Sequence, residues 1–349
     1  MLRYFIQKIL AGLAILMGVI VLIFTLFILF PSAEEITAGQ RADEATKAAM
    51  RSEMGLDKSH TAQFALYLKD LSPLNFGSTE SLKKYKGSRL QIGQSSLLIK
   101  WPYLRNSYQT RKPVSIILAE GLVGSGVLAI LAMGLALILG IGTGIVSALN
   151  PGSLADKICL TIATLGISLP SFFVAVIIAW LFGYVFHSYT GLPMSGSLYQ
   201  INPETGEHFI AFNHLWLPAF ALGIRPYAII MQLTRSNLIE VMQQDYIRTA
   251  KAKGLSQLGI VWNHALRNAL NPVLTAASGW FASLLAGAFF IEYVFNWKGL
   301  GKITIDALQQ SDLPVVMGAV LVIACIFVLV NLLVDILYAV LDPRVKLTS

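Results

Sequence analysis

Residues 121–149 read GLVGSGVLAILAMGLALILGIGTGIVSAL, a run of 29 residues without a charged side chain. The hydrocarbon core of a bilayer is about 30 Å thick, and roughly 20 apolar residues in a helix cross it. A single segment crosses lipid as a helix, because a helix satisfies its own backbone hydrogen bonds. We therefore expect this run to form a transmembrane helix.

Glycine recurs throughout this run, at positions 121, 124, 126, 134, 140, 142 and 144. Small residues four apart let membrane helices approach closely, so we interpret the glycines as a packing surface for neighbouring helices. A dinucleotide-binding loop is the alternative, since Gly140, Gly142 and Gly144 are crowded together. Their spacing is wrong for such a loop, and no suitable strand or acidic residue flanks them.

The composition of the whole chain indicates that much of it, and not only residues 121–149, lies in a membrane. Its 349 residues are 55% hydrophobic and only 13% charged, whereas about 25% of the residues in soluble domains are charged. The formal net charge of +7 would suit an acidic partner, but no nucleic-acid motif accompanies the basic residues. Cys159 and Cys325 lie in apolar stretches and indicate neither a disulfide framework nor a metal cluster. We expect lipid as a partner and no nucleic acid.

Apolar stretches long enough to cross a membrane occur at 9–30, 118–149, 158–186, 215–235, 273–295 and 314–341. The fourth is the weakest, because Arg225 and Pro226 interrupt it, although a helix buried among its neighbours tolerates both. The first is longer than the apolar region of a signal peptide, so we expect it to be retained. The sequence predicts an all-α integral membrane protein with about six transmembrane helices.

The distribution of lysine and arginine predicts the orientation. The segment between the fourth and fifth spans carries several of them, whereas residues 187–214 carry none. Short loops rich in Lys and Arg lie in the cytoplasm, which puts both termini inside. Long loops cross the membrane largely regardless of charge, so the basic segment at 31–115 is expected to form an extracytoplasmic lobe. The expected parts are a first helix at 1–30, this segment, a transmembrane domain at 116–341 and a cytoplasmic tail at 342–349.

Motifs for enzymatic chemistry are missing from the sequence. The string NWKGLGKIT at 296–304 approaches a phosphate-binding loop, but Asn296 replaces the first glycine and Ile303 stands where Ser or Thr must hold Mg²⁺. The five histidines lack metal-ligand spacing, and neither HExxH nor GxSxG occurs. We expect no catalytic residue, metal or cofactor on this chain. An autonomous channel or secondary carrier is disfavoured, because the spans show no proton relay.

Residues 236–271 read SNLIEVMQQDYIRTAKAKGLSQLGIVWNHALRNALN, which is too polar to span a membrane. The pattern predicts a short helix from Tyr246 to Lys253 and a second helix after a break at Gly254. The charges on Asp245 and the two lysines suit the dipole of the short helix, and Gly254 suits the position after its end. On these residues alone, an ordinary solvated amphipathic loop is the alternative.

This stretch resembles the cytoplasmic loop of binding-protein-dependent ABC importer permeases of the dipeptide/oligopeptide type, whose pattern DYxRTAxAKGL is matched from Asp245 to Leu255. The resemblance is strong over 113–346 and weak in the first span. It continues in HALRNALNPV (264–273), LGISLPSFF (165–173), LPAFAL (217–222), IEYVFNWKGLG (291–301), DLPVVMG (312–318) and NLLVDILYAVLDPRVK (331–346).

The resemblance implies the type I ABC importer permease fold in a bacterial inner membrane. It implies a second homologous permease, two P-loop ATPase subunits that hold ATP and Mg, and an extracytoplasmic solute-binding protein. The coupling helix that contacts the ATPase would comprise Asp245, Tyr246, Arg248, Thr249, Ala250, Lys251, Ala252, Lys253, Gly254 and Leu255. Di- or oligopeptides are the expected cargo, with nickel, glutathione or sugars as alternatives. A membrane scaffold that has lost transport is the remaining alternative.

Four features depart from the family or leave its details open. PSAEEITAG at 31–39 replaces the family's motif after the first span, and Lys298 stands where proline is usual. Residues 78–101 look like an insertion, and we predict that they contribute to contact with the binding protein. The translocation path is expected to include Ser168, Pro170, Ser171, Arg225 and Tyr227, where irregular backbone can face water. Kinks that serve only helix packing account for these positions equally well.

Overall fold

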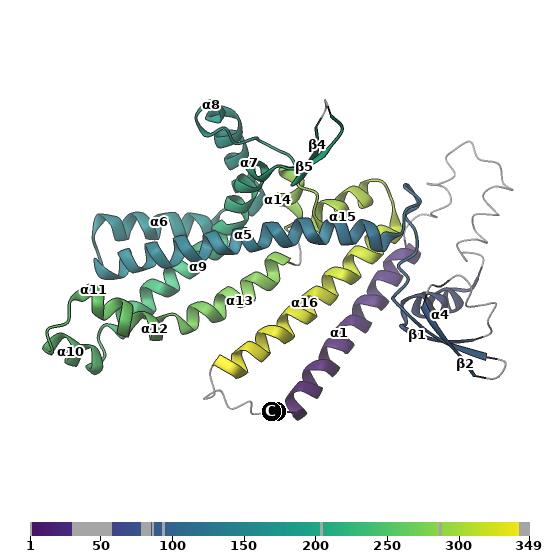
Figure 1. The fold of residues 1–349 in the computed structure, drawn as a ribbon, viewed down its shortest axis with the longest axis horizontal. Coiled ribbons are helices and arrows are strands. Elements are labelled where there is room, and N and C mark those ends of the chain that lie inside the picture. The colour runs from purple at the N-terminus through teal and green to yellow at the C-terminus, as the bar shows by residue number, and fades with distance from the viewer. Residues whose placement is uncertain are drawn as a thin grey trace. The chain divides into compact units, whose positions relative to one another are not determined.

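Long apolar helices dominate the computed structural model (Figure 1), which describes residues 2–29, 58–77, 85, 87–92, 95–202, 205–285 and 288–341. Three helices are long and apolar enough to cross a membrane: α1 (Leu2–Leu29), α5 (Val114–Leu149) and α16 (Leu313–Leu341). The described residues form two compact units. One lies within 1–9, 121–302 and 325–349, and the other within 10–120 and 303–324.

The third expected span, at 158–186, is bent sharply in its middle. α6 (Leu154–Ser168) and α7 (Ser171–Trp180), the latter continued by the π-helical turn η1 (Leu181–Val185), are together apolar and long enough but bend by 115° at the break. The expected fourth and fifth spans coincide with α9 (Trp216–Val241) and with the pair α13 (Asn271–Leu285) and α14 (Phe289–Val294). Neither meets the same criterion of length and composition, so the number of six spans stays a prediction.

Helix α9 is continuous through Pro226, where the sequence suggested an interruption. Proline lacks the N–H that closes a helical hydrogen bond, and it usually breaks an isolated helix. Here Pro226 is buried, and α9 packs against α6, α7 and α13, which hold its course. The helix continues beyond the expected end at 235 to Val241, so the first residues of the expected loop 236–271 belong to it.

The first unit has its hydrophobic core between α5, α7, α9, α13 and α14. Two glycines of α5 allow α9 to approach closely. A Cβ atom at Gly140 would lie 2.8 Å from Ile230 Cγ2, and one at Gly144 would lie 2.7 Å from Thr234 Cβ. The packing role expected for the α5 glycines is therefore confirmed at these two positions, whereas Gly126, Gly134 and Gly142 have no such neighbour.

The second unit contains a small α/β lobe, which contradicts the all-α prediction. Its elements are α4 (His60–Leu71) and an antiparallel sheet of β1 (Leu74–Gly77), β2 (Gly87–Ile92) and β3 (Ser95–Lys100) in the order β1-β3-β2. In β3, Ser96, Leu98 and Lys100 are buried, while Leu97 and Ile99 are more exposed. This alternation is the signature of a half-buried strand. It was missed because the surrounding residues are polar and resemble an insertion.

The lobe is organised around the buried carboxylate of Asp70 at the end of α4. Tyr85 Oη donates a hydrogen bond of 2.6 Å to Asp70 Oδ1, and Arg105 Nε donates one of 3.1 Å to Oδ2. The ammonium of Lys100 donates to the backbone oxygen of Asp70. Burial, and then the hydrogen bond to Asp70, raise the pKa of Tyr85, so this hydroxyl remains a donor at neutral pH. These contacts fix β3 and the chain after it to α4.

The remaining elements connect the long helices. In the first unit, α8 (His187–Thr190) is followed by a two-stranded ladder of β4 (Tyr199–Ile201) and β5 (His208–Ile210) and by the 3-10 turn η2 (Phe212–Leu215). The helix α15 (Leu300–Gln309) precedes α16. PSAEEITAG at 31–39, residues 78–84 of the expected insertion and the tail at 342–349 lie outside the described residues.

Candidate functional site

A short helix stands where the sequence predicts one. α10 runs from Asp245 to Ala252, one residue earlier at each end than expected. It ends at Gly254, whose φ of +78° lies in the left-handed region. The Gly254 N–H donates to the Lys251 carbonyl at 3.0 Å, as is usual for a helix that ends in glycine. A second helical segment follows, made of α11 (Gln257–Ile260), the π-helical turn η3 (Val261–Ala265) and α12 (Leu266–Ala269).

One face of α10 is packed against the ends of α5 and α9. Ile247 is fully buried and Ala250 is nearly so. They belong to a hydrophobic cluster, here named the α10 cluster, that consists of Ala148, Leu238, Ile247, Ala250, Ile260, Val261, Ala265 and Ala269. Through this cluster, α10 is packed together with residues of α5, α9 and the segment that follows α10.

The other face of α10 is open. Of the ten residues expected to contact an ATPase, Ala250 is turned inward, and nine are exposed: Asp245, Tyr246, Arg248, Thr249, Lys251, Ala252, Lys253, Gly254 and Leu255. The pair of Arg248 with Asp245, at 3.4 Å, lies on this exposed face and contributes little to stability. Asn268 of α12 donates a hydrogen bond of 2.9 Å to Tyr246 Oη. Sequence reasoning missed Ile247, whose apolar spacing of three residues from Ala250 was the available signal.

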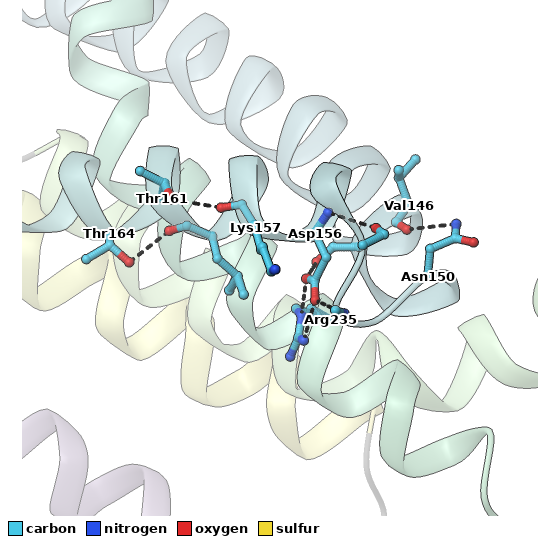
Figure 2. A network of polar contacts seen from close by, with 11 residues as sticks. Val146, Asn150, Asp156, Lys157, Thr161, Thr164 and Arg235 are labelled. Carbon is cyan, nitrogen blue, oxygen red and sulfur yellow. Dashed lines mark hydrogen bonds and ion pairs between the residues drawn. The ribbon is translucent and has the colours of Figure 1, made fainter.

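A buried ion pair lies next to the α10 cluster (Figure 2). Asp156, in the first turn of α6, accepts two hydrogen bonds from Arg235 of α9, from Nε to Oδ1 at 2.7 Å and from Nη2 to Oδ2 at 2.8 Å. Ser147 Oγ at the end of α5 donates to the same carboxylate, and the Gly152 N–H donates to it at 2.7 Å. The side chain of Asp156 is only 3% exposed.

This ion pair joins three helices at one point. Ser147 lies on α5, Asp156 on α6 and Arg235 on α9, and Ser153 Oγ caps the start of α6 by accepting from the Asp156 N–H. Each carboxylate oxygen therefore has two donors, the arrangement in which a buried charge is tolerated. The contact fixes α6 to α9 at Arg235, three residues before Leu238, which is the member of the α10 cluster on α9.

The break between α6 and α7 brings together four of the five residues expected on the translocation path. Ser168 ends α6, Pro170 precedes α7 and Ser171 begins it. Arg225 reaches the same place from α9, where its Nη2 donates to the Leu169 carbonyl at 3.5 Å. Arg225, which interrupts the expected fourth span in the sequence, therefore lies beside the α6–α7 break, within the expected third span.

Tyr227 lies apart from the break and borders a cavity of about 250 Å³ between α5, α6 and α9. Its hydroxyl lies 3.4 Å from Thr143 Oγ1, the donor of a weak hydrogen bond. The other side chains that border the cavity are apolar or glycine: Leu135, Ala136, Leu139, Ile162, Phe220, Gly223 and Ile224. The cavity can take an apolar group, with two hydroxyls at its border.

The glycine-rich string at 296–304, which resembled a phosphate-binding loop, packs against the carboxyl group of Glu292. Glu292 of α14 is buried and accepts hydrogen bonds from Ser125 Oγ at 2.6 Å and from the Lys302 N–H at 3.0 Å. A Cβ atom at Gly299 would lie 2.5 Å from the Glu292 carboxyl carbon. Sequence reasoning missed this role of Glu292. Within the described residues, no group of three or more His, Cys, Asp or Glu side chains is placed to hold a metal ion.

Two family models match the sequence. The model described as "Binding-protein-dependent transport system inner membrane component" matches residues 140–347. The model described as "Binding-prot-dependent transport system membrane comp, N-term" matches residues 1–124. Together they include the α6–α7 break, α10 and the lobe.

Individual relatives match along nearly the whole chain. The dipeptide transport system permease protein DppB of Alkalihalophilus pseudofirmus is 34% identical, with 99% of this chain and 100% of the relative covered. The di/tripeptide transport system permease protein DppB of Pseudomonas aeruginosa is 36% identical, with 94% of each chain covered. The glutathione transport system permease protein GsiC of Pectobacterium atrosepticum is 32% identical, with 99% of each chain covered.

Proposed function

This chain belongs to the family of binding-protein-dependent transport system inner membrane components, and from that premise we propose that it is a permease subunit of an ATP-driven importer of di- or oligopeptides. The family is one of transport components rather than enzymes. The peptide cargo is supported by the two relatives named as dipeptide and di/tripeptide permeases. The similarity to a glutathione permease favours one second cargo, glutathione, which is itself a small peptide.

The observation that carries the proposal is the two-sided packing of α10. Ile247 and Ala250 are buried against α5 and α9, while the residues around them are exposed. A rigid helix with one face anchored in the bundle and one face open suits a lever between an ATPase and the spans. We propose that α10 is the coupling helix and that the ATPases, with ATP and Mg, bind its exposed face.

The rest of the proposed assembly follows the family. The chain forms half of the path and pairs with a second, homologous permease in a bacterial inner membrane. It crosses the membrane six times in the type I permease fold, with both termini in the cytoplasm and the lobe outside. The broken span and Arg225 line the path, since irregular backbone within a membrane is tolerated where it borders water.

A double substitution tests the coupling role directly. Arg248→Glu with Gly254→Leu reverses one charge on the exposed face and forces a side chain onto a φ of +78°. We expect uptake by the reconstituted complex to fall at least about tenfold, the result of losing roughly 1.4 kcal/mol of contact with the ATPase. The measurement is ATP-dependent peptide uptake in proteoliposomes, with co-purification of both ATPases and the second permease.

The control is Lys58→Glu, a charge reversal at an exposed residue before α4. It should leave uptake unchanged. If the double variant assembles and transports as well as the wild type, α10 is not the coupling helix. A wild-type chain that binds no ATPase in several mild detergents would support the scaffold alternative instead.

The lobe is proposed to contact the solute-binding protein through the open face of its sheet. On this face Leu90 is 56% exposed, Ile99 is 46% exposed and Trp101, just after β3, is 90% exposed. An apolar surface with an exposed tryptophan is typical of an interaction site. The strand β3 lies in the centre of the sheet, so deletion of the expected insertion at 78–101 would also destroy the lobe.

A single substitution is therefore the better test of this contact. We expect Trp101→Ala to raise the KM of uptake for the loaded binding protein at least tenfold, since buried tryptophans at interfaces contribute about 2 kcal/mol or more. Trp101→Phe keeps an aromatic ring and should raise it less. Thermal unfolding of the chain should not change, because the indole is solvated here. An unaltered KM would exclude this face as the binding-protein contact.

A further inference from the structure

Arg225 places a positive charge well inside α9. With a rise of 1.5 Å per residue, it lies about 14 Å along the axis from the start of the helix at Trp216. This depth corresponds to the interior of a bilayer that α9 would cross. A charged side chain at such depth is unfavourable in lipid, and it typically faces an aqueous cavity or an anion.

The intramolecular contacts of Arg225 do not neutralise its charge. Its hydrogen bond to the Leu169 carbonyl is long, at 3.5 Å, and the side chain is exposed. Among the described residues, the ion pairs formed by arginine involve Arg105, Arg235 and Arg248 but not Arg225. A guanidinium has five N–H donors, so most of its capacity is directed outward.

The guanidinium of Arg225 lies beside the α6–α7 break. The Leu169 carbonyl lies at the C-terminal end of α6, where the helix dipole carries partial negative charge. Pro170 contributes no N–H, so the break offers acceptors to a cation and few donors to an anion. The guanidinium thus has one weak contact with the break and donors left over for a ligand with two acceptor oxygens.

We propose that Arg225 binds the carboxylate of the peptide during its passage along the α6–α7 break. This inference rests on the proposed peptide cargo. A free C-terminal carboxylate is the anionic group that unblocked linear peptides share, and a guanidinium binds a carboxylate through two parallel hydrogen bonds. Arg225 is thus a specificity-determining residue that favours free peptide acids over blocked peptides. A carboxylate on the second permease is the other source of such a ligand.

The test compares a dipeptide with its C-terminal amide. The complete complex, with ATPases, second permease and binding protein, is reconstituted in proteoliposomes. Uptake of each peptide is measured at a concentration that saturates the binding protein with that peptide. Arg225→Met should lower the acid-to-amide uptake ratio roughly tenfold to a hundredfold, the range expected when a hydrogen-bonded charge pair is lost. Arg225→Lys should retain part of the preference, because it keeps the charge but loses the planar fork.

Two comparisons make the ratio specific. Any preference of the binding protein itself for the acid or the amide is the same with the wild-type and the variant permease, because the same binding protein is used with both. This preference therefore cancels when the two acid-to-amide uptake ratios are compared. Lys157→Met removes an exposed cation elsewhere on the same broken span and should leave the ratio unchanged. If the methionine variant does not assemble, Arg225→Gln provides the same comparison with a shorter polar side chain.

Each outcome has one meaning. An unchanged ratio in Arg225→Met or Arg225→Gln, with uptake intact, overturns the proposal. The proposal is also overturned if Arg225→Met loses the second permease on purification while Arg225→Lys retains it, and the acid-to-amide uptake ratio does not change. That result would assign Arg225 to the interface between the two permeases. A wild-type complex that takes up neither peptide with ATP would refute the proposed function, and the assignment of Arg225 to a peptide carboxylate would fall with it.

Discussion

Replacing Asp156 by leucine is expected to uncouple ATP hydrolysis from uptake and to lower the free energy of unfolding by about 1–3 kcal/mol, which is typical when a polar group loses its hydrogen-bond partner. The substitution deprives Arg235 of the carboxylate that accepts two of its hydrogen bonds. It also removes the acceptor of the Ser147 hydroxyl and of the Gly152 N–H. The turn between α5 and α6 would then no longer be fixed to α9.

The expected uncoupling follows from the position of this pair. Arg235 precedes Leu238 by less than one helical turn, and Leu238 packs with Ile247 of α10 in the α10 cluster. A displacement of α10 is therefore expected to reach α9 and to pass to α6 across their packed interface, one end of which is fixed by the ion pair. Without the ion pair, α10 should still bind the ATPase and ATP should still be hydrolysed, but α6 should follow α9 less closely.

A double variant separates coupling from stability. Asp156→Leu with Arg235→Met replaces the pair by apolar side chains, which is often neutral for stability. We expect its free energy of unfolding to lie closer to that of the wild type than that of Asp156→Leu does, because no unpaired guanidinium remains, while peptide taken up per ATP hydrolysed stays low. The measurements are thermal unfolding in detergent and the uptake-to-hydrolysis ratio in proteoliposomes, with Lys157→Leu as the adjacent exposed control. A double variant with the wild-type ratio would show that the pair only stabilises the fold.

Local patterns explain which parts of this site were predictable. The short helix and its glycine end were read correctly because helix formers, end charges and Gly254 all lie within ten residues. The glycines of α5 likewise predicted close packing, which the contacts at Gly140 and Gly144 confirm. In these cases the physical cause and its signal occupy the same stretch of chain.

The missed features depend on residues that are distant in sequence. Asp156 and Arg235 are separated by 79 positions, and nothing near either residue indicates the other. Glu292 and Ser125 are separated by 167 positions, so the glycines at 299 and 301 suggested a failed phosphate-binding loop instead of a cover for a carboxylate. Pairing of this kind is decided by tertiary packing, which neither propensity nor spacing reports.

The polar surroundings of the lobe hid a different signal. Leu98 lies in a stretch rich in Lys and Ser, and the sequence therefore indicates an insertion at 78–101 rather than a strand. The alternation in β3 is only six residues long, and short alternating runs are ambiguous. The continuity of α9 through Pro226 was also unpredictable locally, since neighbouring helices support it.

The loop that covers Glu292 is expected to tolerate no additional methyl group on α5 at Gly124. In Gly124→Ala, the new Cβ atom would lie 2.2 Å from the Lys298 carbonyl oxygen and 3.1 Å from its carbon. Neither atom can move easily, because Trp297 Nε1 donates to the Gly124 carbonyl at 3.0 Å and Trp297 is fully buried. Overpacking of this kind costs about 1–3 kcal/mol or more, so we expect a clearly lower Tm.

Gly126→Ala is the matched control, two residues further along α5. Nothing lies within 4 Å of a Cβ atom at that position, and alanine favours a helix over glycine by up to about 1 kcal/mol. The Tm of this variant should therefore equal or exceed that of the wild type, whereas that of Gly124→Ala should fall. Equal values for the two variants, measured on the purified chain in one detergent, would mean that the loop at 296–302 does not rest on α5. The opposite signs expected here come from the same chemical change, one methyl group, and differ only because one glycine faces a backbone carbonyl and the other faces open space.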